Sequence, residues 1–97
     1  MSGEDIGNIG YAKKDYEETV IGVITGDGIK IRSCSDHAFD RLMERNIWPK
    51  NVINALKMKS VPAKNNNVAY IYGGTYVYVN NKTGTIISSI YKGRKGK

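Results

Sequence analysis

Residues 35–56 read SDHAFDRLMERNIWPKNVINAL, and their apolar positions recur at helical spacing. The apolar residues that would share one buried helical face are Ala38, Phe39, Leu42 and Met43. Ser35 or Asp36 would cap the start of this helix, and Asn46 suits the left-handed residue that follows a helix end. Pro49 suits the first turn of a second helix that would run to about residue 57. This stretch therefore predicts two helices joined by a tight connection.

A second face of the first predicted helix carries the only histidine of the chain. His37, Arg41 and Arg45 fall at i, i+4 and i+8, so their side chains would form one stripe. Aligned cationic groups repel one another unless an anion lies among them, and a phosphate group would fill that role. His37 could instead be a structural, hydrogen-bonded residue near the helix start. The two arginines could instead pair with carboxylates of their own helix on a solvated face.

Two β-prone runs precede the helices. Residues 19–25 (TVIGVIT) are rich in β-branched side chains, and residues 29–32 (IKIR) alternate apolar and polar ones. Residues 26–28 (GDG) between them are a turn signal. We therefore predict a β-hairpin that leads directly into the first helix.

Three further β-prone runs follow the helix pair, at residues 68–72, 75–80 and 85–91, after a predicted loop at residues 58–66. Because hairpin-type turns separate them, we predict a three-stranded antiparallel meander. The fold class is then α+β, with a helix pair packed on a small twisted antiparallel sheet. The tyrosines on these runs are Tyr70, Tyr72, Tyr76 and Tyr78. We interpret them as sheet-packing residues rather than as base-stacking platforms.

The length of 97 residues predicts one domain with a modest core. We expect residues 1–18 to form a flexible or partly helical N-terminal arm, residues 19–91 the domain, and residues 92–97 a basic tail. The single cysteine, Cys34, excludes an internal disulfide, and no Cys/His cluster is present to hold zinc, so we expect no metal and no other cofactor. No apolar run is long enough to cross a membrane, so we expect no membrane insertion by this domain.

Charge is distributed unevenly along the chain. Residues 1–44 hold all nine acidic residues against five basic ones (net −4), whereas residues 45–97 hold ten basic residues and no acid (net +10). This asymmetry favours an anionic polymer as partner, with nucleic acid ahead of a membrane surface. A basic, solvated surface with no partner is the alternative. The candidate phosphate contacts outside the helical stripe are Lys50, Lys57, Lys92 and Arg94.

Two motifs of this chain resemble those of a toxin family. The run S-D-H-A-x-x-R-x-x-E-R-x-I starts at Ser35, and V-x-V-N-x-x-T-G-x-I-I-S starts at Val77. Residues 19–91 resemble C-terminal toxin domains of the Barnase–EndoU–colicin–RelE superfamily, which are found on contact-dependent inhibition proteins and other polymorphic toxins. The resemblance implies a RelE/barnase-like fold, metal-independent ribonuclease activity, often against transfer RNA, and a cognate immunity protein. It also implies delivery as part of a larger secreted or cell-surface toxin that acts in the cytoplasm of a target cell.

The resemblance also implies roles for particular residues. His37 would be the histidine of the family's first helix, and Arg41 and Arg45 would be its arginines. Ser88 or Ser89 falls where members usually have a threonine on the last strand. The aromatic residue that follows would be Tyr91, and Asn46 stands where the family usually has glycine.

Metal-free RNA cleavage needs a base near the ribose 2′-hydroxyl, an acid near the leaving 5′-oxygen, and cations for the charge of the transition state. A histidine can serve in either proton role, and arginine can bind two phosphate oxygens while it stays protonated. A strand serine could donate to a non-bridging oxygen, and Tyr91 or Lys92 could complete the proton pair. This chemistry requires the last strand to lie alongside the first helix. A non-catalytic RNA- or DNA-binding module that uses the basic second half is the alternative.

Overall fold

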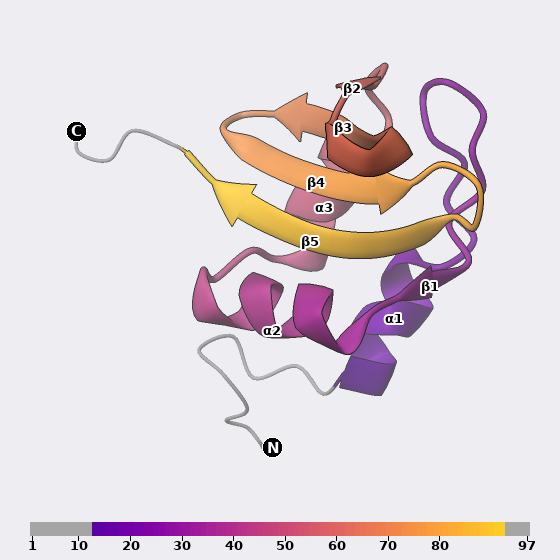
Figure 1. Ribbon diagram of the computed structural model, residues 1–97. Coiled ribbons are helices and arrows are strands. Elements are labelled where there is room, and N and C mark those ends of the chain that lie inside the picture. The colour runs from indigo at the N-terminus through magenta and orange to yellow at the C-terminus, as the bar shows by residue number, and fades with distance from the viewer. Residues whose placement is uncertain (1–12, 93–97) are drawn as a thin grey trace.

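The computed structural model describes residues 13–92, and within them three α-helices accompany a five-stranded mixed sheet (Figure 1). The helices are α1 (Lys13–Val20), α2 (Asp36–Glu44) and α3 (Pro49–Leu56). The strands are β1 (Ser33–Cys34), β2 (Val61–Pro62), β3 (Asn67–Tyr72), β4 (Thr75–Asn80) and β5 (Thr85–Tyr91), and a short 3₁₀ helix, η1 (Lys64–Asn66), lies between β2 and β3. The coarse prediction of an α+β fold is confirmed.

Helix α2 forms as its sequence predicts. The hydroxyl of Ser35 accepts a hydrogen bond from the Ala38 backbone N–H at 3.0 Å and so caps the first turn. All four apolar residues of the predicted inner face are buried. Asn46 has φ 55°, which is the left-handed conformation expected after the helix end.

Helix α3 begins at Pro49, as predicted, and buries Val52, Ala55 and Leu56. Helix α1 packs against it, and the hydroxyl of Tyr16 donates to the Ile47 carbonyl between α2 and α3. The same tyrosine ring meets Phe39 of α2 edge to face, with 5.9 Å between the ring centroids. Tyr16 therefore ties the three helices to one core.

The predicted N-terminal hairpin is wrong in most of its detail. Helix α1 runs to Val20, and residues 19–25 form no strand. A single bridge between Ile24 and Lys30 and three backbone hydrogen bonds between residues 22–25 and 29–31 are the pairing that remains of the hairpin. Tyr16 and Val20 lie one helical turn apart and are both fully buried, so the core contacts of a helix outweigh the β propensity of this run. Of the predicted arm, residues 13–18 are helical, and residues 1–12 lie outside the described residues.

The sheet has the strand order β1-β5-β4-β3-β2 (Figure 1). The meander of β3, β4 and β5 is confirmed, but the sheet is mixed rather than wholly antiparallel because β1 pairs parallel with the start of β5. Residues 58–66, predicted as a loop, contain β2, which pairs antiparallel with β3. Strands β1 and β2 have only two residues each, which is too short to leave a periodic signal in the sequence, and the partner of β1 lies far away along the chain.

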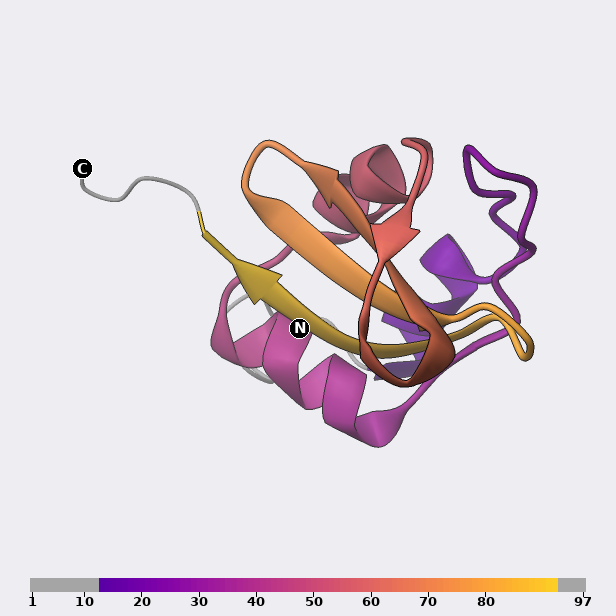
Figure 2. The same ribbon diagram turned by 45° about the horizontal axis from the view of Figure 1, so that its top comes forward.

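Helices α2 and α3 cover one face of the sheet. Helix α2 contacts β5, whereas α3 contacts β3 and β4. The hydrophobic residues of the sheet that are fully buried under the helices are Tyr70, Val77, Val79 and Ile86. The strands turn the alternate residues to the opposite face, and none of the described helices covers that face; Figure 2 shows α2 running alongside β5 at one side of the sheet. We call this opposite side the outer face.

A β-bulge in the last strand decides which of its residues reach each face. Tyr78 pairs with Ser88 and Val79 with Ile86, so Ile87 is the extra residue and has no partner across the strand pair. The bulge shifts the alternation by one residue, which places Ser88 on the outer face with Tyr78 and Ser89 on the helix side with Val77.

Candidate functional site

Helix α2 starts against the edge of the last strand. The backbone N–H of Ser35 donates to the Ile86 carbonyl at 2.9 Å, and the Ser35 hydroxyl lies 3.5 Å from the Ile87 carbonyl. Strand β1 pairs with only the first two residues of β5, so the rest of that edge lies beside α2. The prediction that the last strand passes alongside this helix is therefore confirmed.

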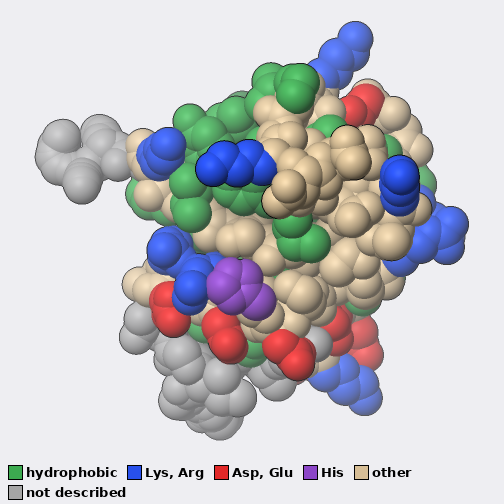
Figure 3. All heavy atoms as spheres, in the orientation of Figure 1, with side chains coloured by type: hydrophobic (Ala, Val, Ile, Leu, Met, Phe, Trp, Pro, Cys, Tyr) green, Lys and Arg blue, Asp and Glu red, His purple; other side chains and the backbone are tan. Residues whose placement is uncertain are grey.

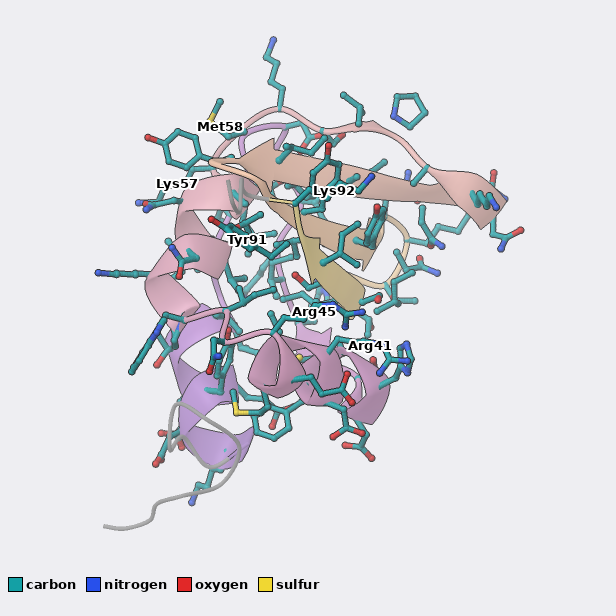
Figure 4. All side chains as sticks on the ribbon, turned by 90° about the vertical axis from the view of Figure 1, so that its left-hand side faces the viewer. Arg41, Arg45, Lys57, Met58, Tyr91 and Lys92 are labelled. Carbon is teal, nitrogen blue, oxygen red and sulfur yellow. The ribbon has the colours of Figure 1, made fainter. Side chains whose placement is uncertain are left out.

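The three residues of the predicted stripe lie at the surface of α2. His37 and Arg45 are exposed, and Arg41 is half-buried. Figure 3 shows the histidine at the surface beside cationic side chains, with acidic side chains on the other side of it. Figure 4 shows Arg41 and Arg45 on the side of α2 nearest β5. The stripe is thus open to a ligand along the junction of helix and strand.

One carboxylate serves both arginines. Glu44 Oε1 lies 3.1 Å from Arg41 Nη1 and 3.7 Å from Arg45 Nη1. Ion pairs of this kind on an exposed helix contribute only about 0.3–0.5 kcal/mol each to stability. The alternative that the arginines pair with a carboxylate of their own helix is therefore present in the structure. Glu44 supplies one negative charge for two guanidinium groups, so this cluster of three side chains keeps a net charge of +1.

Arg45 and Tyr91 both line a pocket of about 380 Å³. The pocket is lined by Arg45, Asn46, Ile47, Asn51, Asn54, Tyr72, Gly73, Thr75 and Tyr91. His37 does not line it, because His37 lies eight residues before Arg45, about 12 Å along the helix axis. The structure therefore brings Arg45 and Tyr91 to one pocket at the end of α2, with Arg41 joined to Arg45 through Glu44, and leaves His37 near the start of the helix, outside that pocket.

The two candidate serines lie on opposite faces of the sheet. Ser89 is fully buried, and its hydroxyl donates to the Tyr76 carbonyl at 2.6 Å. Ser88 is half-buried and lines a hollow on the outer face. Ser88 is therefore the serine whose hydroxyl can reach a ligand on the outer face beside β5.

The lysines predicted to touch phosphate are not gathered with the stripe. Lys50 lines a separate hollow with Thr19 and Trp48, and Lys57 is exposed at the end of α3. Figure 4 shows Lys57 well apart from Arg41 and Arg45. Lys92 lies at the end of β5 with its Nζ atom 5.0 Å from the centroid of the Tyr76 ring. Arg94 lies outside the described residues.

The outer face holds a surface that we did not predict from the sequence. A hollow of about 490 Å³ lies there between the sheet and the segment that contains β2 and η1. Tyr76 and Tyr78 form part of its floor, whereas Tyr70 is fully buried on the other face. Tyr70 packs in the core, as we predicted from the sequence, whereas Tyr76 and Tyr78 are half-buried and open to the hollow. The signal was the strict alternation of Tyr76 and Tyr78 with two valines, which places both tyrosines on the same face.

A second cluster missed from the sequence joins the turn at residues 25–28 to the sheet. Asp27 accepts hydrogen bonds from Thr25 (2.7 Å), Ser60 (2.5 Å) and Tyr70 (2.6 Å). Partial burial would raise the pKa of Asp27, but these hydrogen bonds outweigh it and lower the pKa to about 2. Burial and the hydrogen bond to Asp27 raise the pKa of Tyr70 to about 12. The carboxylate is fully engaged by its donors, so we interpret the cluster as structural.

Within residues 13–92, no three His, Cys, Asp or Glu side chains gather closely enough to hold a metal ion. None of the helices described is long and apolar enough to cross a membrane.

Comparison of the chain with protein-family models, with curated proteins and with solved structures found no match. The fold and site define a small α+β domain with a histidine–arginine stripe beside the last strand of its sheet. A function must therefore be argued from this geometry.

Proposed function

We propose that this chain is a metal-independent ribonuclease domain of the RelE/barnase-like type. The observation that carries the proposal is the position of α2 along the uncovered part of the β5 edge, with His37 and Arg41 at the surface of that junction. A histidine next to a guanidinium group beside an open strand edge is an arrangement that can hold a phosphodiester and move a proton on it.

The reaction we propose is attack of a ribose 2′-hydroxyl on the adjacent phosphate. One base takes the proton of the 2′-hydroxyl, and one acid gives a proton to the 5′-oxygen as its bond to phosphorus breaks. The products are a 2′,3′-cyclic phosphate and a free 5′-hydroxyl. His37 carries out one of these proton transfers, because imidazole can accept or donate a proton near neutral pH.

The geometry divides the arginines between two phosphates. Arg41 lies four residues from His37, about 6 Å along the helix, so both can reach the scissile phosphate. Arg45 lies a further turn away and shares its pocket with Tyr91, so it binds the neighbouring nucleotide. Ser88 can donate to a non-bridging oxygen, and Tyr91 or Lys92 remains the candidate for the second proton transfer.

The substrate and partners follow from the resemblance and the charge. We propose transfer RNA as the substrate, and an acidic immunity protein that covers the basic second half of the chain, where residues 45–97 carry a net charge of +10. The domain would be delivered as part of a larger secreted or cell-surface toxin and act in the cytoplasm of the target cell.

The test is incubation of purified protein with total transfer RNA in EDTA. The wild type is compared with His37→Ala and with Lys14→Ala, which removes an exposed side chain from α1. We expect discrete fragments with 2′,3′-cyclic phosphate ends from the wild type and from Lys14→Ala. His37→Ala should be slower by about 10²–10⁴-fold.

Intact RNA after long incubation with folded wild-type protein would contradict the proposal, and so would equal cleavage by all three proteins. The circular dichroism spectrum of each variant checks that it is folded. If wild type and His37→Ala both retard intact RNA equally on a gel, the chain is a non-catalytic RNA- or DNA-binding module. The outer face, with its tyrosines and bordering lysines, is the observation that favours that second function.

A further inference from the structure

The outer face presents two aromatic rings side by side. Tyr76 and Tyr78 are half-buried, their ring centroids are 6.5 Å apart, and their planes are tilted by 30°. The strand register places Ile71 beside Tyr76 and Ala69 beside Tyr78 on the same face. The floor is therefore a nearly continuous apolar and aromatic surface with no helix over it.

The segment that contains β2 and η1 forms one wall of this surface. The hollow between wall and floor, about 490 Å³, is lined by Val61, Pro62, Ala63, Lys64, Asn67, Ala69, Ile71, Tyr76, Tyr78, Ile87 and Ser88. We call this hollow and its floor the tyrosine platform. Its size is sufficient for one or two planar rings of the size of a nucleobase.

Cations lie at both ends of the tyrosine platform. Lys64 lines the wall, and the Lys92 ammonium lies over the Tyr76 ring. None of the residues that line the hollow is acidic, so the platform itself has no carboxylate to oppose an anion. An occupant that suits both parts has flat, uncharged rings for the floor and negative charges for the rim.

We propose that the tyrosine platform binds unpaired bases of RNA, with the phosphates that join them held at the rim by Lys64 and Lys92. Base stacking on exposed aromatic rings and cations along the backbone are the two terms that dominate the binding of single strands. A phosphate near Lys92 draws that ammonium from the Tyr76 ring, which opens the ring to a base.

The position of the tyrosine platform links it to the stripe on α2. Strand β5 separates the two, with Ser88 on the platform side and Arg41 and His37 beside the strand edge. Figure 3 shows both on one side of the molecule: hydrophobic and cationic side chains lie above, and the histidine lies below. An RNA strand that crosses β5 can therefore place a phosphate at His37 and its neighbouring bases on the tyrosines.

This arrangement determines the class of RNA that binds. In a duplex the faces of the bases are covered by their stacked neighbours, so only a loop, a bulge or a free end can place bases on the platform. This inference takes from the proposed function only the assumption that the bound polymer is RNA. Its test measures binding and not cleavage, so the platform and the ribonuclease proposal can fail separately.

Binding is measured by fluorescence anisotropy with a labelled, unstructured RNA of eight nucleotides and with the same RNA in a blunt duplex, at one fixed salt concentration. The protein carries His37→Ala, which keeps the RNA intact during the measurement. We compare this protein with Tyr76→Leu/Tyr78→Leu, with Tyr76→Phe/Tyr78→Phe, and with Ile24→Ala. Ile24 is the control because it is an exposed hydrophobic residue that lines neither the tyrosine platform nor the pocket beside Arg45.

We expect the leucine pair to bind the single strand at least about tenfold more weakly, because two stacking surfaces are lost. The phenylalanine pair should stay within about twofold of its parent, since it keeps both rings, and Ile24→Ala should change little. The duplex should bind more weakly than the single strand. Equal binding by the leucine pair and its parent would overturn the inference, as would duplex binding as tight as that of the single strand.

The result is independent of the cleavage assay. If the wild type binds unpaired RNA through its tyrosines but produces no fragments, the ribonuclease proposal fails and the tyrosine platform stands. If the wild type cleaves RNA while the leucine pair binds normally, the tyrosine platform fails and the ribonuclease stands. The comparison of single strand with duplex keeps the test valid even if the leucine pair proves unstable, because it needs no substitution of the tyrosines.

Discussion

Two guanidinium groups share the carboxylate of Glu44 at the end of α2, at 3.1 Å from Arg41 and 3.7 Å from Arg45. A group paired in this way is held in one region of space before a ligand arrives, which lowers the entropy lost on binding. The planar fork of each arginine still has N–H donors for phosphate oxygens. At the scale of single residues, these two guanidinium groups are the ones that we propose to bind phosphate, and His37 is the group that we propose to transfer a proton.

The first prediction concerns the geometry of that fork. Arg41→Lys keeps the positive charge but loses the bidentate contact, so we expect cleavage to slow by about 10–100-fold through a loss in kcat. Single-turnover kinetics on a defined RNA would measure it. Arg32→Lys, an exposed arginine before β1, is the matched control and should cleave like the wild type. An unchanged kcat in Arg41→Lys would show that Arg41 does not stabilise the transition state.

The second prediction concerns Asp27, whose pKa is lowered to about 2 from an ordinary 3.8. A lowered pKa means that the folded state prefers the ionised group, so its stabilisation is complete above pH 3.8 and is lost as pH falls through about 2. Replacement by Asn removes this contribution. The free energy of unfolding of Asp27→Asn should therefore fall below that of the wild type above pH 4, and the gap should close by pH 2.

Urea unfolding at pH 5, 3 and 2 measures this gap, and Glu18→Gln, an exposed carboxylate of α1, is the control. The control should follow the wild type at all three pH values. A gap of constant size from pH 5 to pH 2 would show that the effect of Asp27→Asn does not come from its charge.

At the scale of elements, the junction of α2 with β5 rests on Ser35. Its backbone N–H bonds to the Ile86 carbonyl, and its hydroxyl caps α2 through the Ala38 N–H. The same residue thus ends β1, starts α2 and attaches both to the last strand. The direction in which α2 leaves the sheet, and with it the position of the stripe, depends on this residue.

The third prediction tests that cap. Ser35→Ala should lower the free energy of unfolding by about 1 kcal/mol, because the Ala38 N–H loses its acceptor. Ser35→Asn, which supplies another capping oxygen, should recover most of it. Thermal unfolding of the three proteins provides the comparison. Equal melting temperatures for the alanine and asparagine variants would show that the cap is not the cause of the loss.

At the scale of the whole molecule, the chain separates charge between its two halves. The segment from Arg45 onward has ten basic residues and no acid, so we expect this half of the chain to attract a polyanion, over a distance of about 10 Å at 0.1 M salt. RNA association should therefore be fast at low salt and weak at high salt.

The fourth prediction concerns how steeply RNA binding weakens as the salt concentration rises. If Arg41, Arg45, Lys64 and Lys92 each neutralise one phosphate, the logarithm of the binding constant for single-stranded RNA should fall with the logarithm of salt concentration with a slope of about −3. Lys64→Gln should make the slope less steep by about 0.7. Lys14→Gln on α1 should leave it unchanged. A slope near zero would contradict a phosphate-binding role for this surface.

Local signals predicted a large part of this structure. Helices α2 and α3, the Ser35 cap, the left-handed Asn46 and the three meander strands all lie where the sequence placed them. The stripe of His37, Arg41 and Arg45 follows from the same helical period. The hairpin at residues 19–32 was wrong because Tyr16 and Val20 are buried on α1, and such burial depends on partners far away in the sequence.

What the sequence determined by itself is therefore the set of elements and their amphipathic faces, because capping, turn chemistry and periodicity act over a few neighbouring residues. Only the tertiary structure decided which serine faces outward, because one bulged residue, Ile87, reverses the alternation of β5. Only the tertiary structure decided that Tyr70 is buried while Tyr76 and Tyr78 are half-buried, since α2 and α3 pack on one face of the sheet and none of the described α-helices packs on the other. Both outcomes depend on long-range packing, and no window of the sequence contains it.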